Sequence, residues 1–374
     1  VYVLAFNKAN NKYLGKFQPS MSNNTLIASI DIEKIGTDEI TALVLTNLNS
    51  LENGSELVNK INQLTTGQTK EQLLKSLVYT FNNIWSVNER PLPMWGETDI
   101  TPVKESTVTG TVNLYRAVSK INVTFNGGKQ QLAGDNKTEI FKLKSVRVYY
   151  ARTSGLAGSL HAPIANKEGG SDLIDTPSIP DEVNYFPRYK EDGTPNNLLF
   201  ETTSEDGDYA IENQIYVPES DQDQTDEPMC LVIGGYYMGS DKETFYRVDF
   251  KQGNKGSEYY DAIRNHIYNF NINTVTRPGT DEPDPALSKP MAQACWSRMY
   301  DNPLTNWTYY SATNMNVRGD YSFYGYHLGV LRNNTVPGFL SEGEFHDYLP
   351  ETHRLLNEDY RKLESARFFR YFCD

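Results

Sequence analysis

The sequence predicts an all-β protein built from two antiparallel β-sandwich domains. Short runs of β-branched and aromatic residues recur as far as Val275, separated by segments rich in Gly, Pro, Asn and Asp. Tyrosine and phenylalanine are frequent, with 25 and 16 residues. Helical patterns are too few to supply the crossovers that parallel sheets need, so consecutive strands should pair antiparallel.

The first predicted domain covers residues 1–125 and opens with strands. Four runs predict them: VYVLAF (1–6), KYLGKF (12–17), TLIASIDI (25–32) and EITALVLTNL (39–48). The fourth run is almost continuously apolar, which is typical of a strand covered on both faces. We therefore expect it at the centre of a sheet.

One helix is predicted in this domain, over residues 69–85. Apolar residues recur at helical spacing from Leu73 to Trp85. Thr69 and Gln72 stand at the spacing of a capping box. A helix packed on a sheet explains this stripe, and a groove for a partner is the alternative.

Strands resume after the helix. The two prolines of RPLPMWG (90–96) forbid its continuation. The β-branched segment 107–125 predicts one long strand or two. The turn-rich segment 126–138 then marks a boundary, and the second domain covers residues 126–285.

The second domain is predicted to hold strands at 140–151, 211–219, 230–238, 243–250 and 265–275. Residues 152–210 are expected to be mainly loops. Residues 276–290 form a proline-rich acidic linker, which cannot pair as a central strand. Residues 286–374 comprise the end of this linker and an aromatic-rich accessory tail, with a short amphipathic helix inside 351–369.

Composition excludes several classes of protein. A net charge of −13 and a pI near 5.0 argue against binding to nucleic acid, which needs clustered Lys and Arg. Cys230, Cys295 and Cys373 form no CxxC pair and indicate buried thiols. No apolar run reaches the ~20 residues of a membrane helix. The start at Val1, without Met or signal peptide, is typical of a processed or trimmed chain.

Catalytic and cofactor motifs are missing, so we expect no enzyme activity, no cofactor and no metal. The sequence contains no GxSxG, no phosphate-binding glycine loop and no GxGxxG after a strand. His346 and His353 stand near Glu344, Asp347 and Glu351, a set that fits either a zinc or general-base cluster or an ordinary solvated surface. The acidic segment 219–227 lacks the glycine and final glutamate of a calcium loop, so a solvated loop is expected.

Two short polar motifs could be read as a catalytic site or as a receptor-binding site. Arg264, Asn265 and His266 are residue types that catalysis uses, but they stand where a strand begins and have no nucleophile or metal partner. We expect a structural role, with Arg264, like Arg116 and Lys120, on a solvated face or in a hydrogen bond at a strand end. Arg318, Gly319 and Asp320 spell RGD, a tripeptide that some host adhesion receptors read and that also occurs by chance.

Several segments in order resemble one known family. They are LPMWG (92–96), LYRAVSKINV (114–123), FYRVDF (245–250), IRNHIYNFNINTV (263–275) and RPGTDEP (277–283). Together they resemble the fimbrillin family, the subunits of type V pili of Bacteroidales-type bacteria, over roughly residues 1–285. Ser119 stands where the family usually has alanine.

The resemblance implies a fold and a way of assembly. The family has two transthyretin-like β-sandwich domains and no enzyme activity. Its precursors are lipoproteins exported to the outer membrane and the cell-surface fimbrium. Proteolysis removes their first strand, and a strand donated by a neighbouring fimbrial subunit fills the groove that remains.

This chain looks as if it begins at the family's second strand. We therefore hypothesise that its first domain has an unpaired edge or groove for a donated strand. The candidate lining residues are the apolar positions of two predicted strands: Val3, Leu4, Phe6, Leu43, Val44 and Leu45.

The tail is longer and richer in aromatic residues than the last segment of an ordinary subunit of this family, which ends in donor strands. The chain is therefore either an accessory or tip subunit, or a subunit whose tail replaces the donor strand. Candidate adhesion residues, for a receptor on a host or bacterial surface, are Trp307, Tyr309, Tyr310, Arg318, Gly319 and Asp320. One alternative is a carbohydrate-binding adhesin that does not polymerise, in which Trp296 and Tyr324 join the tail aromatics in stacking on sugars. Another is a secreted hydrolase that uses His346 and His353.

Overall fold

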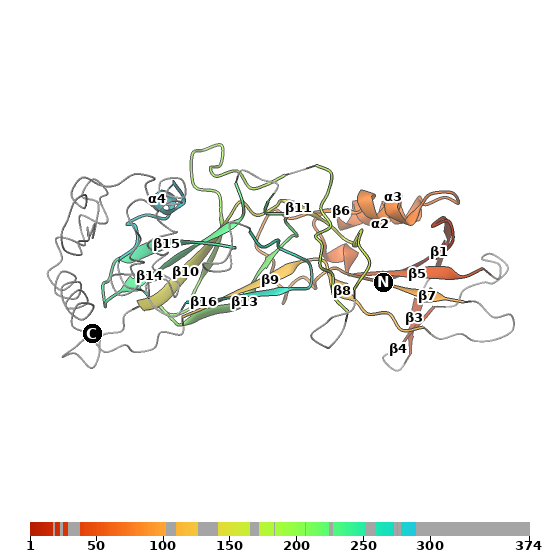
Figure 1. The fold of residues 1–374 in the computed structure, drawn as a ribbon, viewed down its shortest axis with the longest axis horizontal. Coiled ribbons are helices and arrows are strands. Elements are labelled where there is room, and N and C mark those ends of the chain that lie inside the picture. Colours follow the sequence, from red (N-terminus) through yellow and green to blue (C-terminus); the bar gives the residue numbers. More distant parts are fainter. Residues whose placement is uncertain are drawn as a thin grey trace, which may run out of the picture.

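The strands of the protein form one elongated array with helices at both ends (Figure 1). The computed structural model describes residues 1–17, 19–22, 25–28, 38–101, 110–125, 141–164, 172–182, 184–205, 207–223, 227–250, 259–272, 275 and 278–288. Within this part the chain is mostly strand, with three short α-helices and one 3₁₀ turn. The prediction of an all-β protein is confirmed.

The first sheet has five strands in the order β2-β1-β5-β7-β8, and all neighbours are antiparallel. The strands are β1 (Tyr2–Asn7), β2 (Tyr13–Phe17), β5 (Ile40–Thr46), β7 (Met94–Ile100) and β8 (Tyr115–Arg116). Every residue of β5 is buried, so the prediction that 39–48 forms a central strand is confirmed. β3 (Pro19–Ser22) and β4 (Thr25–Ala28) form a separate hairpin.

Two helices cover one face of this sheet. The 3₁₀ turn η1 (Leu48–Ser50) leads into α2 (Gly54–Asn62), and α3 (Lys70–Ser76) follows. Their buried residues Leu57, Ile61, Leu73 and Leu74 share one core cluster with Leu4, Phe6, Leu43 and Leu45 of the sheet. Burial of these apolar side chains, at roughly 25 cal/mol per Å², holds the helices on the sheet.

The predicted helix 69–85 is correct at its start and wrong in length. Thr69 and Gln72 form the predicted capping box. The helix ends at Ser76, and β6 (Val78–Thr80) pairs with β11 (Ser154–Leu156). A distant strand offers residues 78–80 ladder hydrogen bonds, which a local pattern cannot show. The sequence analysis also did not predict α2.

Two further sheets form the second half of the molecule. One has the order β12-β10-β14-β15 and the other β13-β9-β16. Their strands are β9 (Ser119–Phe125), β10 (Phe141–Tyr149), β12 (Leu198–Glu201), β13 (Ala210–Val217), β14 (Cys230–Tyr237), β15 (Glu243–Asp249) and β16 (Ile267–Ile272). The prediction that strands are scarce in 152–210 therefore misses β11 and β12.

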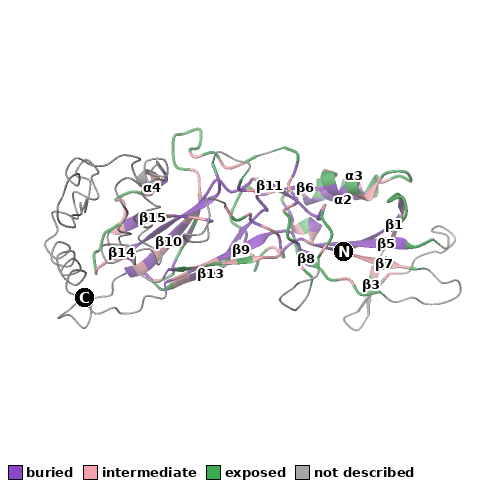
Figure 2. Cartoon of the chain, in the orientation of Figure 1, coloured by how far each residue is buried: buried purple, intermediate pink, exposed green. Residues whose placement is uncertain are grey.

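The two sheets pack face to face as a sandwich. Alternate residues of β9 point inward, including Val123 and Phe125. The Phe125 ring lies 5.5 Å from that of Phe141 on β10, and Phe141 lies 5.7 Å from Tyr246 on β15. Figure 2 shows this buried layer running through the length of the strands.

One strand pair contradicts the expectation of purely antiparallel sheets. β16 runs parallel to β9, with Ile267 opposite Lys120 and Ile272 opposite Phe125. Parallel neighbours need a long connection between them. More than a hundred residues separate these two strands, so the chain has ample length to return in the same direction.

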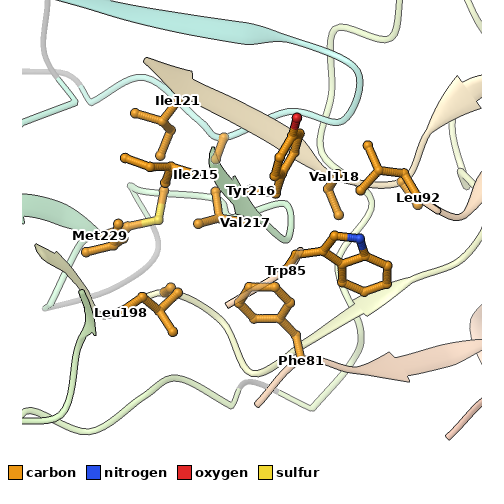
Figure 3. Close-up of a cluster of buried hydrophobic side chains, with 14 of the residues drawn as sticks. Phe81, Trp85, Leu92, Val118, Ile121, Leu198, Ile215, Tyr216, Val217 and Met229 are labelled. Carbon is orange, nitrogen blue, oxygen red and sulfur yellow. The ribbon is translucent and has the colours of Figure 1, made fainter. Parts of the chain in front are cut away.

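Strand pairing crosses the boundary predicted at residue 126. β9, assigned to the first domain, pairs with β13 and β16, and β6 pairs with β11. The hydrophobic core is also continuous here. Figure 3 shows side chains from before the boundary, including Phe81, Trp85 and Val118, beside Val217 and Met229 from after it. The two parts of the chain are therefore packed together through a shared core.

The predicted linker is partly a docked segment. α4 (Pro283–Ser288) packs on β14 and β15, and Ala286 and Leu287 are buried. Residues 283–288 of the predicted linker 276–290 are therefore packed on the sheet. No helix in the described residues is long and apolar enough to cross a membrane.

Candidate assembly surface

The six predicted groove residues lie side by side on two paired strands. Val3, Leu4 and Phe6 are on β1, and Leu43, Val44 and Leu45 are on β5. Leu4 lies opposite Leu43, and Val3 lies opposite Val44. All six are at most 6% exposed. The structure thus brings them together but buries them.

These residues divide between the two faces of the sheet, because side chains alternate along a strand. Leu4, Phe6, Leu43 and Leu45 join the main core under α2 and α3. Val3 and Val44 belong to a small cluster of buried residues that also contains Ala5, Phe17 and Ile40. β1 is paired on both sides, so the six residues line no open groove in this arrangement.

Among the described strands β2 pairs only with β1, and part of its outer side is an open edge. The amide of Tyr13 on that side donates to the Gln68 carbonyl at 2.9 Å, so the open part of the edge lies beyond Tyr13. The amide of Asn7 donates to the Lys12 carbonyl at 2.8 Å, and the amide of Lys8 donates to the Glu39 carbonyl at 3.0 Å. Odd-numbered residues of β1 therefore bond toward β2, and even-numbered ones toward β5.

This alternation fixes which groups of β2 face outward. Gly15 and Phe17 lie opposite Ala5 and Val3, so their backbone groups point toward β1. The backbone N–H and C=O of Lys16 point away from β1, toward the open edge. Such outward groups are a template for an added strand.

The opposite edge of the sheet is less accessible. β8 pairs only with Met94 and Trp95, but the chain just before it lies close against the rest of β7. A Cβ atom placed on Gly96 would come within 2.1 Å of the Asn113 carbonyl oxygen. This close approach leaves no room for another strand beside Gly96.

β2 is held firmly enough to serve as such a template. The Tyr13 ring packs edge-on against Phe6 at 5.7 Å, and burial raises the pKa of the Tyr13 hydroxyl. The ammonium of Lys16 donates to Asn62 Oδ1 on α2 at 2.6 Å. A strand whose side chains are fixed in this way loses little additional entropy when a partner pairs with it.

A hollow of about 390 Å³ lies beside the start of β1. Val1, Tyr2 and Pro91 line it together with the turn at residues 47–50. Asn47 there adopts a left-handed conformation, and its side-chain amide donates to the Leu92 carbonyl. The hollow therefore lies at the end of the first sheet where β1 begins and β5 finishes.

The Arg264-Asn265-His266 motif makes contacts within the fold, and Arg264 is not where we expected it. Its guanidinium is completely buried and ion-paired with Glu219. Asn265 has a positive φ of 59°, and its Oδ1 accepts from Arg116 Nη1 at 3.0 Å. His266 Nδ1 lies 2.9 Å from the Arg264 carbonyl oxygen. These bonds shape the turn that starts β16.

A polar row follows on the outer face of β9 and β16. Asn122 donates to Asn269 Oδ1 at 2.9 Å, and Thr124 donates to Asn271 Oδ1 at 2.8 Å. These residues alternate with the inward apolar ones, so the strand spelled IYNFNI is a solvated outer strand.

The other predicted site residues lie outside the described residues. They are Trp296, Trp307, Tyr309, Tyr310, Arg318, Gly319, Asp320, Tyr324, Glu344, His346, Asp347, Glu351 and His353. The adhesion hypothesis and the two alternatives that rest on them stay predictions. Within the part of the chain that the structure describes, no group of His, Cys, Asp and Glu is arranged to hold a metal ion.

A sequence profile decides the family. Residues 1–286 match the profile of the fimbrillin-A associated anchor proteins Mfa1 and Mfa2. The chain belongs to this anchor family. The resemblance to fimbrillins found in the sequence is thereby confirmed, and the chain has a fimbrial, adhesion-related role at the cell surface.

Solved structures give weaker likenesses. A candidate cell adhesion protein from Bacteroides eggerthii is 13% identical, with a TM-score of 0.46 and coverage of 75% of this chain and 83% of that chain. Another, from Parabacteroides distasonis, is 14% identical, with a TM-score of 0.45 and coverage of 75% and 88%. A fimbrial assembly protein from the same organism is 15% identical, with a TM-score of 0.38 and coverage of 72% and 82%. No curated protein matches.

Proposed function

We propose that the chain is an accessory or anchor subunit of cell-surface fimbriae that joins other fimbrial subunits by strand addition. The match of residues 1–286 to the anchor family carries this proposal. The open edge of β2 supports the mode of contact, because it offers outward backbone groups on a rigid, buried sheet.

Addition at Lys16 leaves the pairing of β1 with β2 and β5 intact. An incoming strand would bond to the backbone of Lys16, and its alternate side chains would set the register. The groove lined by Val3, Leu4, Phe6, Leu43, Val44 and Leu45 is a second route. It requires a paired strand to leave first, because these side chains are buried.

We also propose where the chain works, and we propose that it catalyses no reaction. As the fimbrillin resemblance implies, the chain is made as an exported lipoprotein precursor and works at the outer membrane. Adhesion then follows from its place in a fimbrium. We assign it no catalytic step and no cofactor, since binding through backbone and apolar surfaces accounts for such a role.

One pair of variants at Lys16 tests strand addition. Lys16→Pro removes the outward N–H and adds a ring at the edge, whereas Lys16→Ala keeps the donor and removes only the side chain. Fimbrial subunits of the same organism are incubated with each protein, with and without trypsin, and SDS-resistant complexes are measured.

The wild type and Lys16→Ala should form resistant complexes, and Lys16→Pro should form few or none. Complexes of equal yield with all three proteins would exclude the β2 edge and favour the groove. If no protein associates with any subunit, the proposed function itself is wrong.

A further inference from the structure

Residues 279–288 form a strap on the edge and outer face of the sheet that contains β14 and β15. The amide of Phe245 donates to the Thr280 carbonyl at 2.9 Å, and the amide of Thr280 donates back to the Phe245 carbonyl at 2.9 Å. Gly279 allows this approach, because a Cβ there would lie 2.3 Å from the Phe245 carbonyl oxygen. The strap therefore occupies the edge of β15 at one point.

α4 continues the strap over the face of the sheet, and Figure 1 shows it beside β15. Ala286 and Leu287 pack in a cluster with Cys230, Val232 and Phe245, separate from the main core. Asp284 accepts from Arg188 Nε at 3.0 Å and from the Tyr189 hydroxyl at 2.7 Å. Arg247 Nη1 donates to the Leu287 carbonyl at 3.2 Å.

The strap is separable from the fold beneath it. A helix of six residues has no stability of its own in water, so α4 persists only through these contacts. Its cluster contains seven buried residues and contributes nothing to the core between the sheets. Such an element opens at a lower free energy than the whole domain.

The edge under the strap is self-complementary. The backbone N–H and C=O of Phe245 point away from β14 and bond to Thr280. Every second residue of a strand points its backbone groups the same way, so those of Glu243 and Arg247 also point away from β14. An antiparallel pair of two β15 strands, centred on Phe245, would set each Glu243 opposite the Arg247 of the other copy. Within one chain Glu243 contacts Arg147 and Arg247 pairs with Asp249. In the pair each would gain a further neighbour of opposite charge, which favours that register, and a two-fold pair makes the contact twice.

We propose that residues 279–288 guard the edge of β15 against a second copy of this chain, and that release of the strap lets two copies pair through β15. The strap satisfies the two hydrogen bonds of Phe245 that the second copy would otherwise make. This contact is distinct from strand addition at β2, so either proposal can fail without the other.

Labelling of Cys230 reports whether the strap opens. Burial raises the pKa of this thiol to about 12 and leaves it 0% exposed. In a full chain carrying Cys295→Ser and Cys373→Ser, Gly279→Val displaces the strap by a backbone clash and Leu287→Ser removes its apolar anchor. Glu282→Gln changes an exposed strap residue and is the matched control.

We expect Cys230 in the two displaced variants to react at least about tenfold faster than in the wild type or Glu282→Gln, under conditions where circular dichroism shows the sheets intact. Light scattering should then show dimers of Gly279→Val and Leu287→Ser that increase with protein concentration, while the control stays monomeric. Equal labelling in all proteins would show that the strap is not separable. Fast labelling without association would show that it guards no edge. Either result overturns the proposal.

Discussion

Arg264 and Glu219 form an ion pair that is completely shielded from solvent, with Nη2 2.6 Å from Oε2. Arg264 Nη2 also donates to the Leu156 carbonyl at 3.0 Å, and the Ser178 amide donates to Glu219 Oε2 at 3.2 Å. Four segments of the chain meet at these two side chains. The pair therefore fastens β11 to the ends of β13 and β16.

Removing one partner of this pair should destabilise the protein strongly. Arg264→Met leaves the Glu219 carboxylate buried without its counter-ion, and we expect a loss of about 3–5 kcal/mol in urea unfolding. The double variant Arg264→Met/Glu219→Leu should recover part of that loss. Lys8→Met, at an exposed ion pair, is the control and should change little. A single variant as stable as the control would contradict this account.

Tyr79 and Gly155 should be energetically coupled. The Tyr79 hydroxyl donates to the Ala117 carbonyl at 2.9 Å, and a Cβ on Gly155 would lie 2.4 Å from that hydroxyl oxygen. We expect Gly155→Ala to cost about 1–3 kcal/mol through overpacking. Tyr79→Phe should cost about 1–3 kcal/mol through the unpaired carbonyl.

In the double variant Gly155→Ala/Tyr79→Phe, the clash with the hydroxyl disappears, while the close contacts of the added Cβ with ring carbons Cζ, at 2.5 Å, and Cε1, at 2.8 Å, remain. The combined loss in a denaturant titration should therefore be somewhat smaller than the sum of the two single losses. If the loss of unfolding free energy in the double variant equals the sum of the two single losses, the methyl group added at Gly155 does not press on the Tyr79 hydroxyl.

Thr69 should stabilise α3 through its cap. Its hydroxyl oxygen accepts from the Gln72 amide at 3.2 Å, and Gln72 Oε1 accepts from the Thr69 amide at 2.9 Å. We expect Thr69→Ala to cost about 1 kcal/mol and Thr69→Ser to cost much less, measured by thermal unfolding. Equal losses for both would assign the effect to the side-chain methyl group.

Asp261 should make stability depend on pH. Burial, with a smaller contribution from Asp221 and Asp223, raises the pKa of this carboxyl. The folded protein then holds the proton more tightly than the unfolded chain, so the protonated form favours folding, and this stabilisation is lost as pH rises through the folded pKa. Asp261→Asn keeps the oxygen that accepts from the Gln222 amide.

We expect Asp261→Asn to be more stable than the wild type at pH 7, with the difference shrinking as pH falls toward 4. Urea unfolding across that range measures it. A variant less stable than the wild type at pH 7 would show that the charged carboxylate is favourable in the folded state.

The local pattern of the sequence predicts the strands well where alternation is strong. Residues 140–151 became β10, 230–238 became β14 and 243–250 became β15, each within two residues at either end. The continuous apolar run of 39–48 became the central strand β5. In each case the signal is the period of the side chains, which is a property of the segment itself.

The candidate site was predictable only in part. The sequence placed Val3, Leu4 and Phe6 beside Leu43, Val44 and Leu45, because both runs are apolar strands, and the structure pairs them. It could not show that β1 is already covered on both sides. Whether the backbone N–H and C=O of Lys16 point toward β1 or away from it depends on how β1 and β2 are aligned in the sheet. No residue type in the sequence determines that alignment.

The sequence by itself determined the all-β class, the capping box at Thr69 and the relationship to fimbrial proteins, because these depend on local periodicity and short motifs. Tertiary structure alone decided that α3 ends at Ser76, that Arg264 is buried and that residues 283–288 dock on β14 and β15. The reason is physical: strand pairing, ion-pair burial and docking are contacts between segments far apart in the chain. Their free energy depends on where the partner lies, and that position exists only in the folded molecule.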